Sequence, residues 1–240
     1  MNRFDNRAAN QLRPIKFTSN YTRYAEGSVL IEAGFTRVLC NVSVEDKVPR
    51  WREASGGGWL TAEYAMLPRA THQRTDRQHA SDSARSQEIR RLIGRALRAA
   101  VNVDLLGPRT LTVDCDVLQA DGGTRTASIT GAYVAVALAM HKLIAAGLVP
   151  ADALITPVAA VSVGVVDDEL LLDLDYREDS AAEVDMNVVM TGTGKFVEIQ
   201  GTAEGAPFEH HTLIQLVDLA RHGIEQLLAE QIIAIKQLFP

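Results

Sequence analysis

Cysteine is scarce in this 240-residue sequence, which contains only Cys40 and Cys115. Both lie in apolar, strand-like segments, so we expect two buried thiols in a reducing compartment. The scarcity argues against a small secreted domain held together by disulfides. Two isolated cysteines without nearby histidines also do not supply the ligands of a zinc site.

A long apolar run is missing as well, since no stretch reaches the ~18 apolar residues that indicate a membrane-spanning helix. The charged first residues are not followed by the apolar segment of a secretory signal. The chain is 47% hydrophobic and 22% charged, as soluble globular proteins commonly are. We therefore expect a cytoplasmic protein without a membrane partner, folded as one compact domain over residues 1–240.

An overall excess of positive charge is absent, because the formal net charge is −6 at pH 7. Segment 69–98 is different: eight arginines and three acidic residues give it +5 and leave −11 for the rest of the chain. This separation of charge indicates a surface that handles an anion. A solvated arginine-rich helix and loop would give the same pattern, and that alternative stays open.

Hydrophobic periodicity predicts an α+β fold in which strands precede a helix, and this order occurs twice along the chain. Ser86 is the expected N-cap of the first helix, and Gly147 is expected to end the second. Segment 68–86 is polar and arginine-rich, which predicts a mobile loop. The expected strands are 28–33, 37–44, 59–67, 110–119, 158–166, 170–174, 187–191 and 195–200, and the expected helices are 87–103, 126–146 and 212–238.

Residues 121–131 (DGGTRTASITG) connect a predicted strand to a predicted helix. The two glycines allow backbone N–H groups to approach a ligand closely, and the helix N-terminus behind them supplies partial positive charge. Arg125 adds a full charge, and Thr124, Thr126 and Ser128 add hydroxyl donors. The pattern predicts a phosphate-binding loop but not a P-loop, although a tight turn with a capped helix would use the same residues.

Four acidic side chains lie within eight residues of the second half, namely Glu178, Asp179, Glu183 and Asp185. Asp179 and Asp185 could hold Mg²⁺, and one carboxyl group could instead protonate a leaving alkoxide. An acidic surface turn is the simpler alternative. Carboxylates in one half and an anion-binding loop in the other are the groups that phosphoryl transfer requires.

Several longer motifs resemble the ribonuclease PH family in its bacterial form, in order and over essentially the whole chain. Motifs of this length are far more specific than the short patterns above. Segment 77–85 departs from the family, whose corresponding loop is usually rich in glycine and lysine. The motifs are NQLRPI (10–15), AEGSVL (25–30), WLTAEY (59–64), MLPR (66–69), DCDVLQADGGTRT (114–126), DSAAEVDMN (179–187) and QGTAEG (200–205).

The resemblance implies the RNase PH fold, with two βαβα-like halves related to the second domain of ribosomal protein S5. It also implies a homo-hexameric ring, a trimer of dimers. The implied activity is a phosphate-dependent 3′→5′ exoribonuclease that trims tRNA precursors beyond the CCA end, with inorganic phosphate as co-substrate and Mg²⁺ as cofactor. The family's phosphate site maps onto Arg85, Gly123, Thr124 and Arg125, and its acidic catalytic and metal-binding pair maps onto Asp179 and Asp185.

Arg69, Arg74 and Arg77 are expected to line the RNA path through phosphate contacts, which give affinity without sequence recognition. The resemblance implies that the polymer is RNA and not DNA. One alternative is a non-catalytic RNA-binding ring subunit of an exosome-like assembly, which would lack the arginines or the acidic pair. Another is a small-molecule phosphotransferase, which would carry a longer glycine- and serine-rich nucleotide loop than this sequence has.

Overall fold

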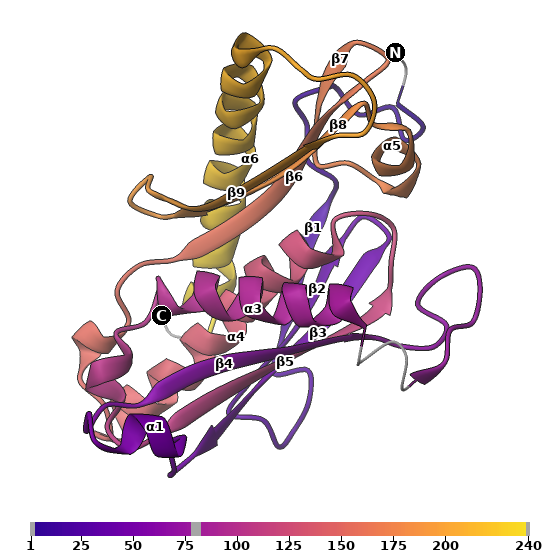
Figure 1. The fold of residues 1–240 in the computed structure, drawn as a ribbon. Helices are drawn as coiled ribbons and strands as arrows, with labels where there is room; N and C mark the ends of the chain where they lie inside the picture. The colour runs from indigo at the N-terminus through magenta and orange to yellow at the C-terminus, as the bar shows by residue number, and fades with distance from the viewer. Residues whose placement is uncertain (1–2, 78–82, 239–240) are drawn as a thin grey trace.

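The computed structural model describes residues 3–77 and 83–238, which form an α+β fold with two sheets (Figure 1). The fold class predicted from the sequence is confirmed. One sheet is built from the first half of the chain and the other from the second half. A long helix, α4 (Thr124–Ala145), contacts strands of both sheets and joins the two halves.

The first sheet has the strand order β1-β2-β3-β5-β4. Neighbouring strands are antiparallel except for β4 and β5, which are parallel. A parallel pair requires a crossover connection, and helix α3 lies within it. The elements of this half are β1 (Ile15–Ser19), β2 (Gly27–Ala33), β3 (Thr36–Glu45), α1 (Arg50–Glu53), β4 (Trp59–Met66), α3 (Ala84–Arg98), η1 (Val103–Leu106) and β5 (Thr110–Gln119).

The second sheet is antiparallel throughout, with the strand order β7-β6-β8-β9. Helix α6 packs against β6, β7 and β8 of this sheet, so the half again consists of strands covered by a helix. Its elements are η2 (Ala151–Ala153), β6 (Val158–Val166), β7 (Glu169–Leu172), α5 (Tyr176–Ala181), β8 (Val184–Thr191), β9 (Phe196–Ala203) and α6 (His210–Lys236).

Helix α4 is apolar on all sides because it lies against both sheets. Val134, Val136, Leu138 and Met140 are at most 1% exposed, although they point in different directions around the helix. By length and composition such a helix could cross a membrane, but 83% of its most apolar window is buried inside the structure. A helix that is hydrophobic all round and covered by protein is the core helix of its fold.

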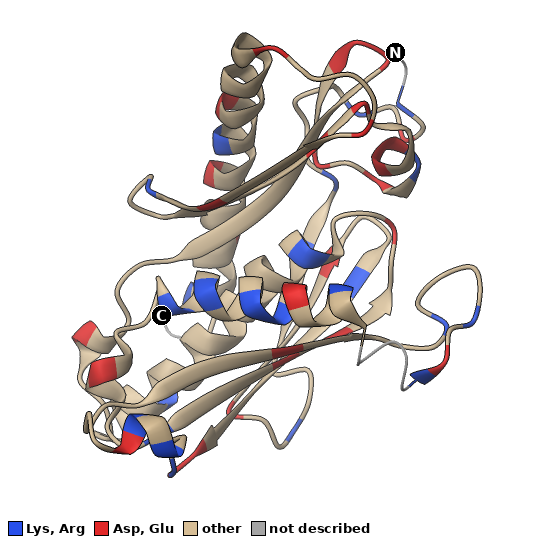
Figure 2. Cartoon of the chain, in the orientation of Figure 1, with Lys and Arg blue, Asp and Glu red and all other residues tan. Residues whose placement is uncertain are grey.

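Helix α3 buries one face and leaves its arginines on the other, as the sequence predicted. Ile89, Leu92 and Ile93 face the core, and Figure 2 shows basic residues recurring along the exposed side. The prediction that Ser86 caps this helix is wrong, because the Ser83 side chain accepts a hydrogen bond from the Ser86 N–H at 3.1 Å. The helix also ends at Arg98 instead of continuing to residue 103.

Two further expectations are corrected by the structure. The acidic segment 178–185 is not a surface turn, because it contains the end of α5 and the start of β8. Strand β1, which pairs with β2 at the edge of the first sheet, was not predicted. The predicted mobile loop 68–86 is only partly visible, since residues 78–82 lie outside the described residues.

The turn before α4 lies directly against the segment that precedes α5. Gly122 has a φ of +73°, and a Cβ added there would lie 2.5 Å from the carbonyl carbon of Asp175 and 2.6 Å from the carbonyl oxygen of Leu174. Only glycine permits this conformation and this approach together. The contact brings the loop at residues 121–123 next to the acidic segment of the second half.

Substitution of Gly122 by alanine should therefore destabilise the protein more than the same change at Gly147. Gly147 also has a positive φ, +69°, but an added Cβ would meet no atom within 4 Å. We expect Gly147→Ala to cost about 1 kcal/mol from backbone strain alone, and Gly122→Ala to cost roughly 3 kcal/mol or more because overlap is added. Urea unfolding measures both, and equal losses would contradict the close contact.

Candidate functional site

The loop before α4 forms the first wall of the site. Gly123 is the N-cap of the helix, with a φ of +61°. The Thr124 hydroxyl forms a hydrogen bond of 2.9 Å with the Tyr64 hydroxyl of β4. A helix N-terminus with unpaired N–H groups favours an anion at this place.

Two of the predicted hydroxyl donors are committed to the helix itself. Thr126 Oγ1 donates to the Gly123 carbonyl oxygen at 2.9 Å, and Ser128 Oγ donates to the Thr124 carbonyl oxygen at 2.7 Å. Both side chains are buried. Thr126 and Ser128 therefore stabilise the first turn of α4, and the expectation that they donate to a ligand is wrong.

The Arg125 guanidinium is held by side chains from two other elements. Its Nη1 donates to Gln200 Oε1 of β9 at 2.9 Å and lies 3.3 Å from Glu88 Oε1 of α3. Gln200 Nε2 also donates to Glu88 Oε1 at 3.3 Å. Glu88 and Gln200 were not predicted as part of the site, yet together they orient the arginine that the sequence singled out.

Asp179 and Asp185 lie within electrostatic range of Arg85 and Arg125. Asp179 lies in α5 and Asp185 near the start of β8. Burial raises the pKa of Asp179, while the positive charges of Arg85 and Arg125 oppose this shift. Because both arginines act on both carboxylates, the structure brings together the four charged residues that the sequence predicted from separate segments.

Asp185 is the more perturbed of the two carboxyl groups. Burial raises its pKa to about 6, the neighbouring Asp179 carboxylate adds to the shift, and Arg125 opposes it. Glu204, which follows β9, raises the pKa of both groups further. A carboxyl group with a pKa near neutrality can exchange a proton under physiological conditions, as a general acid must.

The acidic pair offers oxygen ligands but no complete metal cage. Asp185 Oδ1 is buried and has no hydrogen-bond partner among the described residues. Over residues 3–77 and 83–238, no group of three or more His, Cys, Asp or Glu side chains forms a metal site. An unpaired carboxylate oxygen beside a second carboxylate still fits Mg²⁺, which commonly takes one or two carboxylates plus oxygens from water and substrate.

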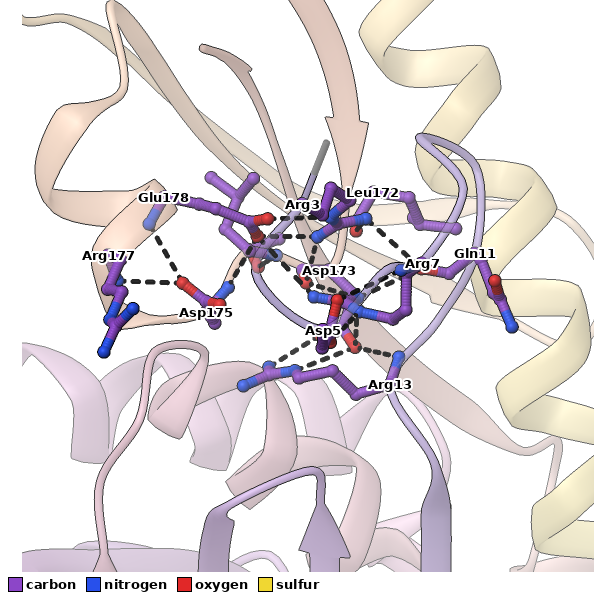
Figure 3. A network of polar contacts seen from close by, with 12 residues as sticks. Arg3, Asp5, Arg7, Gln11, Arg13, Leu172, Asp173, Asp175, Arg177 and Glu178 are labelled. Carbon is purple, nitrogen blue, oxygen red and sulfur yellow. Dashed lines mark hydrogen bonds and ion pairs between the residues drawn. The ribbon is translucent and has the colours of Figure 1, made fainter. Parts of the chain in front are cut away.

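A buried network anchors the loop 173–178 behind the site (Figure 3). Arg13 Nε and Nη2 donate to the two oxygens of Asp173 at 3.0 and 2.7 Å, and its Nη1 donates to the Asp121 carbonyl oxygen at 2.6 Å. Burial alone would raise the pKa of Asp173, but the charge and hydrogen bonds of Arg13 hold it below its usual range. Arg13 thus fastens the loop before α4 to the loop before α5.

The same network also includes the acidic residues Asp175 and Glu178 and gives each of them a structural role. Asp175 caps α5 by accepting from the N–H groups of Arg177 and Glu178. Glu178 accepts from Arg3 Nε at 2.7 Å and is only 7% exposed. Glu178 is therefore structural, and the acidic cluster seen in the sequence divides into anchoring residues and the pair at the site.

The predicted RNA-contacting arginines lie elsewhere. Arg69, Arg74 and Arg77 are exposed in the segment that follows β4. Arg69 Nη1 donates to the His72 carbonyl oxygen at 2.6 Å. Burial raises the pKa of Asp116 on β5, and the Arg77 charge opposes this shift. The structure thus leaves these arginines on the surface and gives no contact between them and the acidic pair.

Family comparison agrees with this arrangement of two halves. The profile described as "3′ exoribonuclease family, domain 1" matches residues 11–141, and the profile of domain 2 of the same family matches residues 156–223. The first match alone covers more than half of the chain. The chain belongs to the 3′ exoribonuclease family. The family predicted from the sequence motifs is thereby confirmed.

Solved structures show that the family fold extends over nearly the full length of this family member. A crystal structure of Rrp46 from rice (Oryza sativa) has a TM-score of 0.78 at 19% identity, covering 97% of this chain and 100% of the other. A chain of the Archaeoglobus fulgidus exosome, with RNA bound to the active site, has a TM-score of 0.78 at 21% identity and covers 94% and 91%. At these identities the likeness establishes the fold.

The raised pKa of Asp185 predicts that Asp185→Asn stabilises the protein at neutral pH. Below about pH 3 the carboxyl group is protonated in both the folded and the unfolded chain, so the variant should gain nothing there and only little at pH 4. Stability of the wild type falls as pH rises from about 4 to about 6, because only the unfolded chain releases the proton readily. After allowance for solvent screening, we expect a gain of about 1 kcal/mol at pH 7.5.

Urea unfolding at pH 4 and pH 7.5, without phosphate and with EDTA, measures this difference. Asp218→Asn, an exposed carboxylate on α6, serves as the control and should show no comparable pH dependence. An Asp185→Asn variant that is less stable than the wild type at pH 7.5 would contradict the proposed electrostatic penalty.

The buried ion pair makes a separate prediction about Arg13. Arg13→Met should destabilise the protein by about 3 kcal/mol, because Asp173 would remain buried without its partner. The double variant Arg13→Met/Asp173→Asn should recover part of this loss, since asparagine tolerates the φ of +56° at position 173. Denaturant titration of the single and double variants tests this coupling, and simply additive losses would refute it.

Proposed function

We propose that this protein is a phosphorolytic 3′→5′ exoribonuclease that trims the 3′ ends of tRNA precursors in the cytoplasm. Family membership supports exoribonuclease chemistry. The observation that carries the proposal is the close contact of Gly122 with Leu174 and Asp175, which brings the loop before Arg125 next to the segment that holds Asp179. The charges of Arg85 and Arg125 oppose the raised pKa of both carboxyl groups, which agrees with this arrangement. Cations that hold phosphate beside an acid are the groups required for attack on a phosphodiester.

In this mechanism, Arg85, Arg125 and the N–H groups near Gly123 and Thr124 hold inorganic phosphate. A phosphate oxygen attacks the last phosphorus of the RNA, and the bond from that phosphorus to the 3′-oxygen of the preceding nucleotide breaks. The products are a nucleoside 5′-diphosphate and an RNA shortened by one residue. Alignment of the two reactants supplies much of the catalysis, as in other phosphoryl transfers.

The leaving 3′-oxygen must receive a proton, and in this proposal Asp185 helps to provide it. Its pKa of about 6 leaves a fraction of the group protonated near neutral pH. Mg²⁺ held beside Asp179 and Asp185 would neutralise charge that develops on the reacting oxygens. One phosphate bond replaces another, so the reaction should run backwards when nucleoside diphosphate is abundant.

The proposed function also includes the contacts with RNA and the oligomeric assembly. We propose that Arg69, Arg74 and Arg77 contact phosphates of the incoming RNA, and that six copies form a ring as a trimer of dimers. The three arginines are exposed and so are available to a partner. The similarity to an exosome chain solved with RNA bound supports an RNA substrate.

The alternative is a non-catalytic, RNA-binding ring subunit of an exosome-like assembly. The similarity to Rrp46 from rice and to an exosome chain favours this alternative as much as it favours the enzyme. Incubation with labelled tRNA precursor and Mg²⁺, with and without phosphate, separates the two. Nucleoside diphosphates formed only with phosphate support the enzyme, whereas binding without cleavage supports the subunit.

Arg125→Ala tests the proposed phosphate site directly. Loss of its charge should reduce phosphorolysis by at least about 100-fold, since an electrostatic contact to a transferring phosphoryl group is worth several kcal/mol. Arg125→Lys should recover only part of the activity, because lysine cannot form the bidentate contact. Rates at low phosphate measure the effect, with Arg221→Ala on α6 as an exposed arginine control. Normal rates in Arg125→Ala would refute the assignment.

A further inference from the structure

A groove of about 490 Å³ lies between helix α3 and the edge strand β4, outside the site described above. Trp59, Thr61 and Glu63 line it from β4, and Arg91, Arg95 and Arg98 line it from α3. Figure 2 shows the basic residues of α3 along this part of the molecule. A cationic groove in a protein of net charge −6 needs a physical explanation.

The arginines of the groove are only partly neutralised by the protein. Arg95 Nε lies 3.1 Å from Glu198 Oε2, so its charge is shared with β9. Arg91 is exposed and forms no hydrogen bond or ion pair with the described residues. Burial and the nearby Arg95 charge lower the pKa of Arg98. An anion in the groove would relieve this repulsion between like charges.

Aromatic side chains lie beside these cations. The Arg98 guanidinium lies over the Trp59 ring, 4.7 Å from its centroid, and Arg98 Nη1 donates to the Leu60 carbonyl oxygen at 3.0 Å. Trp51 packs edge-on against Trp59 with the ring centroids 4.7 Å apart, and 65% of Trp51 is exposed. Exposed aromatic rings among arginines are the combination with which proteins bind single-stranded nucleic acid.

Helix α3 carries residues of both the groove and the proposed phosphate site. Arg85 lies in the first turn of this helix, and Glu88 contacts Arg125 one turn later. Arg98 follows Arg85 by thirteen residues, which is ~20 Å along a helix. An extended RNA strand covers that distance with roughly three or four nucleotides. The groove therefore lies where the chain of a bound RNA would run before it reaches the reacting bond.

We propose that this groove binds the single-stranded RNA segment that lies several nucleotides to the 5′ side of the bond being cleaved. The inference rests on the proposed function for the direction of the strand but not for binding itself. Arg91 and Arg95 contact phosphates, and Trp51 provides a surface on which a base stacks. Long RNA substrates then bind at two sites, whereas oligonucleotides that reach only the site at Arg125 do not contact the groove.

Substrate length is the variable that tests this proposal. In Arg91→Ala/Arg95→Ala, we expect KM for a single-stranded 12-nucleotide RNA to rise about 10-fold, while kcat, KM for phosphate and KM for a 2-nucleotide RNA stay unchanged. The slope of log KM against log salt for the longer RNA should weaken by about 1.4, for two lost phosphate contacts. Arg221→Ala/Lys236→Ala on α6 is the matched control for loss of two charges. Equal effects on both RNA lengths overturn the proposal.

Tryptophan fluorescence tests occupancy of the groove independently of catalysis. The chain contains two tryptophans: Trp59 lines the groove, and Trp51 packs against Trp59 beside it. Without phosphate, the 12-nucleotide RNA should quench their emission, and Trp51→Ala should weaken RNA binding measured by anisotropy. If RNA binds without quenching, the groove proposal fails although the enzyme proposal stands. If quenching occurs without phosphorolysis, the proposed activity fails and the groove stands.

The competing occupant is a second copy of this chain. Light scattering of Arg91→Ala/Arg95→Ala distinguishes it, because removal of these arginines from an RNA-binding surface should leave the molar mass unchanged. A fall in molar mass in the variant would assign the groove to an interface between copies and overturn its role in RNA binding.

Discussion

The buried ion pair between Arg13 and Asp173 is the contact on which the geometry of the site depends. Both residues are at most 5% exposed, and taking two charges out of water costs several kcal/mol each. The pair offsets this cost by its bidentate geometry and by the third bond from Arg13 to the Asp121 carbonyl oxygen. Apolar contacts between the two sheets tolerate small displacements, whereas this set of directional bonds does not.

That constraint explains how the six-residue helix α5 can hold Asp179, the carboxylate proposed to act in catalysis, in a fixed position. A helix this short does not hold itself in water. Asp175 caps it, Arg3 binds Glu178 in its first turn, and Arg13 binds Asp173, two residues before the cap. The position of Asp179 is therefore set by a segment more than 160 residues earlier in the chain. Gly122 completes the arrangement, because a side chain there would push the two loops apart.

Features that depend on local periodicity could be predicted from the sequence. Features that depend on contacts with residues far away in the chain could not. The alternation of Leu111, Val113, Cys115 and Val117 marks β5, and each of these residues is buried as expected. Strand β1 escaped prediction because its five residues are only partly buried and exist as a strand through pairing with β2. Helix α5 escaped prediction because its six residues are too few for a periodic pattern and because Arg3, which anchors it, lies 175 residues away; its Asp175–Glu178 capping box was a local signal that the prediction missed.

The same distinction applies within the site. The turn at Gly123 and the charge of Arg125 belong to one short segment, so the strand–glycine–helix pattern was sufficient to single them out. Glu88 and Gln200 lie 37 and 75 residues away from Arg125, and nothing in the local sequence ties either of them to it. Asp179 and Asp185 carry an electrostatic cost, seen in the raised pKa of both groups, which Arg85 and Arg125 offset only in part. A fold can tolerate this electrostatic cost only if other contacts stabilise it. Here the stabilising contacts are those of the apolar helix α4, which is buried against both sheets.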